Sequence, residues 1–309
     1  MLKYIGKRLL MMIPVMAGVI IIVFSMLYIT PGDPAMLILG ETSTEAERDA
    51  LREEMHLNDG YFARLGDFCY NLIFKFDLGK SYANGQPVID LIKARMPATA
   101  TMAVVSVAFA LVLGMILGIV SAVKHYTLLD NVSMTLALVG VSMPNFWQGL
   151  LLMLLFSVNL GWLPATGYGT WKHIILPAVT VGTSSAGIIA RMTRSSMLEV
   201  INADYINTAR AKGQKELVVI IRHGLRNALI PVITTAGLQF GSMLGGALLT
   251  ETVFAMPGLG KLMVDSVSGR DYTVVQGGVL VIAIMFSMVN LLVDILYAYA
   301  DPRVKSSYT

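Results

Sequence analysis

Long stretches without Asp, Glu, Lys or Arg are the feature that most constrains how this chain can fold. Crossing a bilayer takes about 20 consecutive apolar residues, and an ionisable side chain at its centre costs about 2.5 to 3.5 kcal/mol. Six windows meet that requirement: Leu9 to Gly32, Met96 to Val123, Val132 to Val158, and the stretches between Lys172 and Arg191, between Arg226 and Glu251, and between Asp271 and Asp294. The sequence therefore predicts an all-α integral membrane protein with six transmembrane helices, in which residues 1–309 form a single transmembrane domain.

The distribution of charge predicts the orientation in the membrane. Only 14% of the residues are charged, against roughly 25% in soluble domains. Six spans place both termini on the same side. If that side is the cytoplasm, Lys and Arg exceed Asp and Glu in the inner segments and the acids dominate outside, as the positive-inside rule requires. The excess of Lys and Arg is therefore explained by the orientation in the membrane and by contact with membrane lipid. It requires no nucleic-acid partner.

Three segments stand apart from the spans. Residues 33–95 form a predicted extracytoplasmic insertion, in which TSTEAERDALREEM indicates an amphipathic helix capped by Thr42 or Ser43. Residues 191–226 form a basic, largely helical inner loop broken at Gly213. The outer segment before the last span contains MPGLG, a turn signal.

The basic start of the chain resembles a signal peptide, but its apolar run exceeds the usual 7 to about 15 residues, so we expect it to remain as the first span.

Small residues recur at four-residue spacing in two of the predicted spans and form ridges suited to close helix contact. They are Ala110, Gly114, Gly118 and Ala122 in the second span, and Gly237, Gly241 and Gly245 in the fifth. We interpret both ridges as helix-packing surfaces, within the chain or against a partner subunit. Lining a conduction path is the alternative.

Motifs for catalysis or metal binding are missing from the sequence. Gly79, Lys80 and Ser81 match the end of a P-loop, but Phe74 occupies the position of its first glycine. The four histidines lack the spacing of metal ligands, and GTSSAG does not match the nucleophile elbow G-x-S-x-G. We therefore expect no enzyme, no cofactor and no metal site.

The polar residues of the predicted spans are uncharged, whereas ion-driven transporters place carboxylates or histidines at mid-membrane. Asp294 lies at the inner end of the last span, where an interfacial position is expected rather than a proton site. The energy for any transport is therefore expected to come from outside this chain.

The inner loop contains a short predicted helix from Ala203 to about Lys212, capped by Asn202 and ended by Gly213. Ten residues give a rod of about 15 Å, and such a short helix needs a surface to pack on. The residues alone leave two interpretations open, a membrane-surface helix held by lipid head groups or a helix that docks on another protein.

The loop resembles a known family. ADYINTARAKG at 203–213, followed by RHGLRNALIPV at 222–232, is similar to the inner-loop signature of permease subunits of ATP-binding-cassette importers, in the form of the dipeptide and oligopeptide branch. Further motifs of that branch run along nearly the whole chain: PGDP (31–34), FDLGKS (76–81), LPATGYG (163–169), ILPAVTVG (175–182), RMTRSSMLEV (191–200), ETVFAMPGLGKLMVDSV (251–267) and RDYTVVQGGVL (270–280).

The resemblance implies the type I importer permease fold in a bacterial plasma membrane, with both termini cytoplasmic. It implies that the loop helix couples the permease to a cytoplasmic ATPase. The residues that match the signature of the family or its branch are Asp204, Tyr205, Thr208, Ala209, Arg210, Ala211, Lys212 and Gly213. Asn207 stands where the wider superfamily has Glu, and Thr273 replaces a proline common in the branch.

The implied partners are a second homologous permease, two cytoplasmic ATPase subunits and an extracytoplasmic substrate-binding protein. The implied cargo is a di- or oligopeptide, and importers of nickel or glutathione share the same scaffold. Two other classes remain as alternatives on the sequence, an autonomous ion-gradient transporter or channel and an intramembrane hydrolase. The missing buried charge disfavours the former, and the missing nucleophile and metal motifs disfavour the latter.

Overall fold

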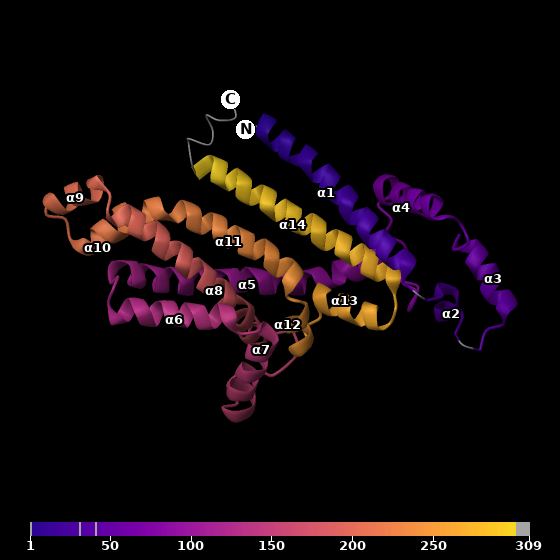
Figure 1. Cartoon of the computed structure of the whole chain (residues 1–309). Coiled ribbons are helices and arrows are strands. Elements are labelled where there is room, and N and C mark those ends of the chain that lie inside the picture. The colour runs from indigo at the N-terminus through magenta and orange to yellow at the C-terminus, as the bar shows by residue number, and fades with distance from the viewer. Residues whose placement is uncertain (1, 31, 41, 301–309) are drawn as a thin grey trace.

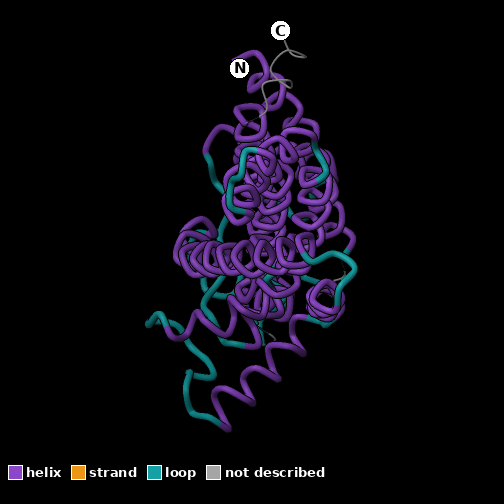
Figure 2. The backbone as a smooth tube through the Cα atoms, turned by 90° about the vertical axis from the view of Figure 1, so that its left-hand side faces the viewer, coloured by secondary structure: helices purple, strands orange, loops and turns teal. Residues whose placement is uncertain are grey.

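The computed structural model describes residues 2–30, 32–40 and 42–300. Helices and loops make up this part of the chain, and it contains no strand (Figure 2). One isolated bridge joins Lys80 to Pro87 in the loop that precedes the second long helix.

Five long helices lie side by side and form the body of the molecule (Figure 1). Each contains an apolar window long enough to cross a membrane. They are α1 (Leu2–Ile29), α5 (Val88–Val123), α8 (Lys172–Ile201), α11 (Arg226–Gly246) and α14 (Tyr272–Ala300). The predicted spans one, two, four, five and six are thus long apolar helices.

The third predicted span is bent. α6 (Leu128–Ser142) is followed by α7 (Asn145–Met153) and a π-helix, η1 (Leu154–Asn159), and the two halves meet at 103°. The break falls at Met143, which precedes Pro144 and has extended backbone angles, as the steric demand of a following proline favours. The predicted span from Val132 to Val158 is therefore a pair of helices with a sharp bend, and the total of six crossings stands if the bent pair counts as one.

Glycines bring the long helices into backbone contact. A Cβ atom on Gly118 of α5 would lie 2.5 Å from Thr193 Cβ and 2.6 Å from the carbonyl oxygen of Ala190, both on α8. Gly114, one turn earlier, is equally close to the α8 backbone. α5 and α8 form the most extensive helix pair of the molecule, and only residues without a side chain allow this approach.

The glycine ridge of α11 faces α14. A Cβ atom on Gly237 would lie 2.1 Å from Val293 Cγ2, and Cβ atoms on Gly241 and Gly245 would lie 3.2 Å from Phe286 and 3.3 Å from Ile282. All five glycines of the predicted packing ridges therefore lie against other helices of the same chain.

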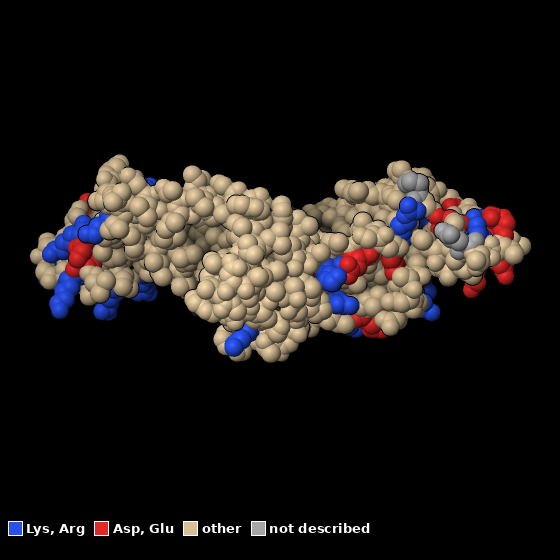
Figure 3. Space-filling view, turned by 90° about the horizontal axis from the view of Figure 1, so that it is seen from below, with Lys and Arg blue, Asp and Glu red and all other residues tan. Residues whose placement is uncertain are grey.

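Short helices cover the two ends of the bundle. At one end lie α9 (Asp204–Ala211), α10 (Glu216–Val218) and a π-helix, η2 (Val219–Leu225); at the other lie α2 (Pro34–Leu39), α3 (Glu45–Glu54), α4 (Tyr61–Lys75), α12 (Leu248–Val253) and α13 (Leu259–Ser268). Charged side chains gather over these ends and leave a broad, nearly uncharged band between them (Figure 3). That band is what a membrane-embedded surface requires.

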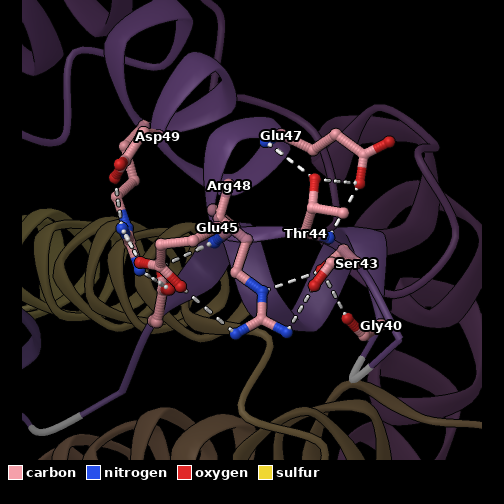
Figure 4. Close-up of polar contacts among 10 residues, drawn as sticks. Gly40, Ser43, Thr44, Glu45, Glu47, Arg48 and Asp49 are labelled. Carbon is pink, nitrogen blue, oxygen red and sulfur yellow. Dashed lines mark hydrogen bonds and ion pairs between the residues drawn. The ribbon is translucent and has the colours of Figure 1, made fainter.

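The cap of α3 differs from the prediction by one or two residues. Thr44 is the N-cap: its hydroxyl accepts from the backbone N–H of Glu47, and the Glu47 carboxylate accepts from the backbone N–H of Thr44 (Figure 4). This capping box satisfies two N–H groups that would otherwise lack a partner. Ser43 instead accepts a hydrogen bond from Arg48, so the predicted caps Thr42 and Ser43 are wrong.

Candidate functional site

The loop helix α9 lies at one end of the molecule, between the end of α8 and the start of the α10–η2–α11 segment (Figure 1). It begins at Asp204, after an extended Ala203. The predicted cap, Asn202, does not cap it, because Asn202 belongs to the end of α8 and its side-chain amide donates to the carbonyl oxygen of Leu198 at 2.9 Å. The break before α9 is therefore the C-terminal end of a long helix.

Gly213 ends the loop helix as the sequence predicts. Its φ angle of +75° lies in the left-handed region that glycine adopts without steric cost. The backbone N–H of Gly213 donates to the carbonyl oxygen of Arg210, and the N–H of Gln214 donates to that of Ala209. A Cβ atom at Gly213 would meet nothing within 4 Å, so backbone conformation alone selects glycine here.

One face of α9 packs inside the loop itself. Ile206 is 1% exposed and Ala209 is 7% exposed, and they form one hydrophobic cluster with Val219 of η2, against which Val200 of α8 packs. Ala209 is thus a packing residue of the loop and does not lie on its outer surface.

Polar contacts hold α9 to the segment that follows it. The Arg210 guanidinium and the Glu216 carboxylate form an ion pair at 2.8 Å, and hydrogen bonding to Glu216 raises the pKa of Arg210 further. The side-chain amide of Asn227 donates to the Tyr205 hydroxyl at 2.8 Å, and His223 is hydrogen-bonded to Gln214 at 2.8 Å. These contacts attach α9 and the turn after it to α10, η2 and the start of α11.

The other face of α9 is exposed. It carries the remaining residues that match the family signature: Asp204, Tyr205, Thr208, Ala211 and Lys212, followed by Gly213, with Arg210 half-buried at its edge. These side chains are short, polar or charged, apart from the half-exposed ring of Tyr205. We refer to this exposed face as the docking face of α9.

A buried ion pair joins three helices near the same end, and sequence reasoning missed it. The Arg194 guanidinium of α8 donates to the Asp130 carboxylate of α6 at 2.9 and 3.0 Å, and the Ser121 hydroxyl of α5 donates to the same carboxylate. Asp130 is 4% exposed. In the sequence, Asp130 is a lone acid at the edge of an apolar window, and this pattern alone indicates no more than the end of a span.

Glu251 is a second buried carboxylate, at the opposite end. It is fully buried, and it accepts from the Thr99 hydroxyl at 2.6 Å and from the backbone N–H of Lys261 at 3.0 Å. The Thr99 hydroxyl in turn accepts from the N–H of Leu259 at 2.8 Å. Burial raises the pKa of Glu251. The predicted MPGLG turn is thus attached to α5 at Thr99, and a Cβ atom on Gly258 would overlap the Glu251 carboxylate.

Asp271 makes a similar connection between two of the motifs. Its carboxylate accepts from the Ser81 hydroxyl and, at 3.1 Å, from the backbone N–H of Tyr82. Asp271 is 4% exposed. FDLGKS and RDYTVVQG, almost 190 residues apart in the chain, therefore meet at the start of α14.

Comparison with known proteins places these features in a family. Residues 110–306 match the model of the binding-protein-dependent transport system inner membrane component, and residues 1–103 match the N-terminal membrane component of such systems.

Similar proteins cover the whole chain. A dipeptide transport system permease protein of Alkalihalophilus pseudofirmus is 44% identical over 333 residues, covering 99% of this chain and 100% of the relative. A glutathione transport system permease protein of Pectobacterium atrosepticum is 46% identical over 305 residues, covering 99% of both chains.

Solved structures share the fold. A chain of the MetNI methionine ABC transporter in an inward-facing conformation has a TM-score of 0.59 at 21% identity, covering 69% of this chain and 97% of that one. An amino acid ABC transporter gives a TM-score of 0.51 at 15% identity, covering 70% and 94%.

Proposed function

This chain belongs to the family of binding-protein-dependent transport system inner membrane components, and on that premise we propose that α9 couples it to a cytoplasmic ATPase. The protein is a multi-pass inner-membrane permease subunit of an ATP-driven importer of the peptide class. Its relatives transport dipeptides or glutathione, which is itself a short peptide.

The observation that carries the coupling proposal is the orientation of α9. A helix that lies on a membrane exposes an apolar face to the lipid. In α9 the strongly apolar side chains, Ile206 and Ala209, are buried in the loop, and the docking face is mainly polar. That distribution supports a groove on another protein, rather than lipid head groups, as the surface on which α9 docks.

The packing of the loop would transmit a displacement of α9 to the long helices. α9 is packed on Val200 at the end of α8 and on Val219 at the start of the segment that continues into α11. α8 has 30 residues, a length of about 45 Å at 1.5 Å per residue. It packs along α5, while α11 packs along α14. A shift of α9 would therefore reach four of the five long helices through these packed contacts.

The proposed assembly contains a second homologous permease, two ATPase subunits on the cytoplasmic side and a substrate-binding protein outside. Closure of the ATPases on ATP displaces α9 and tilts both permeases outward, and the binding protein releases its peptide into the cavity between them. The relatives are named permease proteins of transport systems, which supports a role as one subunit of a larger assembly.

The test changes the docking face and leaves the interior of the loop intact. Ala211→Trp places a bulky ring on the exposed face of α9, and Ala63→Trp makes the same change on the exposed surface of α4 as a control. In proteoliposomes with the complete transport system, we expect Ala211→Trp to lower peptide uptake about ten-fold, the equivalent of about 1.4 kcal/mol, and to abolish stimulation of the ATPase by the binding protein. Ala63→Trp should leave both rates unchanged. Normal uptake and normal stimulation in Ala211→Trp would contradict the coupling role of α9.

A further inference from the structure

A cavity opens beside the outer insertion and belongs to neither the coupling loop nor the helix-packing ridges. It has a volume of about 350 Å³ and lies between the end of α1, the insertion helices and the start of α14. This volume is within the range of about 300 to 1,000 Å³ that small-molecule pockets occupy. Phe24, Leu27 and Tyr28 of α1 form its apolar wall.

Arg64 of α4 brings a positive charge to this cavity. Its guanidinium carbon lies 5.3 Å from the centroid of the Tyr28 ring, and its Nη1 donates to the carbonyl oxygen of Leu57 at 3.4 Å. Within residues 2–30, 32–40 and 42–300, no carboxylate lies within ion-pair distance of Arg64. The ring holds the guanidinium in place by a cation–π contact and leaves its charge uncompensated.

The other arginine of the cavity is neutralised. Arg52 of α3 forms ion pairs with Asp33 at 2.5 Å, Glu45 at 2.9 Å and Asp49 at 2.5 Å. Hydrogen bonding from Arg52 lowers the pKa of Asp33, which keeps that carboxylate ionised and engaged. Arg64 is therefore the cation that remains for a ligand.

A second donor points to the same kind of ligand. Gln276 of α14 lines the cavity, and its side-chain Nε2 is buried without a hydrogen-bond acceptor among the described residues. An amide donor that is buried without a partner destabilises the folded protein. A ligand oxygen would satisfy it, and Tyr82 lines the cavity nearby with a further hydroxyl group.

We propose that this cavity binds a short peptide on the outer side of the permease, with Arg64 and Gln276 receiving its C-terminal carboxylate and the wall of α1 receiving its apolar atoms. The proposal rests on the proposed function, because a peptide cargo is what supplies such a carboxylate. Guanidinium and amide donors converging on one cavity fit a carboxylate, since charge-assisted hydrogen bonds are about twice as strong as neutral ones. The phosphate of an anionic lipid has the same chemistry and is the competing source of an anion.

The test measures binding of L-alanyl-L-alanine and of its C-terminal amide to the assembled permease–ATPase complex, without binding protein, in nanodiscs of phosphatidylcholine. We expect the free acid to bind at least ten-fold more tightly than the amide. Arg64→Gln should remove that difference, and Gln276→Leu should reduce it. Lys93→Gln removes one exposed positive charge from the same end of the molecule without touching the cavity, so it should preserve the difference.

Three results would overturn the proposal: equal affinity for acid and amide, a preference that survives Arg64→Gln, or loss of peptide binding when phosphatidylglycerol is added. The last result would assign the cavity to a lipid phosphate.

Uptake of the dipeptide by the wild-type system with its binding protein is measured in parallel. If uptake proceeds while the cavity shows no preference, only this inference is wrong. If the system takes up no peptide, the proposed function is wrong.

Discussion

At the scale of single residues, Glu251 shows how a buried carboxyl group can hold a turn in place. Its carboxylate is fully buried and accepts hydrogen bonds from α5 and from the first turn of α13. A buried carboxylate is tolerated only where donors surround it, because burial without partners is costly. The hydroxyl of Thr99 bridges Glu251 to the N–H of Leu259, so three segments share one small network.

Removal of Glu251 should therefore destabilise the fold. Glu251→Ala leaves the Thr99 hydroxyl and the N–H of Lys261 without their acceptor. We expect a loss of about 3 kcal/mol in the free energy of unfolding, the upper end of the cost of unsatisfied buried groups. Thermal unfolding of the purified protein in detergent measures this change.

The matched control is Asp265→Ala on α13. Asp265 is 59% exposed and pairs with Lys261 on the surface of α13, and exposed pairs contribute about 0 to 1 kcal/mol. The melting temperature of Asp265→Ala should stay close to that of the wild type. Equal melting temperatures for the two variants would show that the Glu251 network does not hold the turn.

At the scale of helices, the α5–α8 contact depends on the absence of side chains. Gly118 has no space for a Cβ atom between Thr193 and the backbone of Ala190, whereas Gly18 of α1 has nothing within 4 Å of the same position. Gly118→Leu should therefore separate the two helices and reduce the amount of folded protein in the membrane several-fold, because overpacking costs typically about 1 to 3 kcal/mol and here meets backbone atoms.

Gly18→Leu tests whether the effect comes from packing. Both substitutions place leucine in an apolar helix, so differences in helix propensity and hydrophobicity cancel. Quantitative immunoblotting of membranes and detergent melting compare the two variants. If Gly18→Leu is as damaging as Gly118→Leu, the loss does not come from the α5–α8 contact.

Long apolar helices could be predicted from the sequence because a membrane span is a local property of about 20 residues. The bend at Met143 was missed, since Pro144 is compatible with a kinked but continuous span. The N-cap of α3 at Thr44 and the start of α9 at Asp204 were misplaced by one or two residues, as helix ends commonly are.

At the scale of the whole molecule, contacts between distant segments could not be predicted. Thr99 and Glu251 are 152 residues apart, and Asp271 and Ser81 are 190 apart. Each residue alone resembles an ordinary polar residue at the edge of a span, and only the fold brings the pairs together. The docking face of α9 was predicted through its resemblance to a family, but the sequence did not show that Ala209 faces inward.

The orientation of the molecule in the membrane can be predicted from the placement of its ends and of its basic loop. In Figure 1, the start of α1, the end of α14 and the loop helix α9 lie toward one side, and α2 to α4 lie toward the other. We propose that the side of α9 is cytoplasmic, because it carries Arg210, Lys212 and Lys215 in a short loop, where the positive-inside rule is strongest.

Labelling with a membrane-impermeant maleimide tests this orientation. The single cysteine is first removed by Cys69→Ser, and Glu54→Cys on α3 and Lys215→Cys beside α9 are then introduced separately, both at exposed positions. In spheroplasts, Glu54→Cys should react without permeabilisation, whereas Lys215→Cys should react only after the membrane is opened. The reverse pattern would place α9 outside the cell, where no ATP-hydrolysing partner could reach it, and would contradict the coupling mechanism together with the topology.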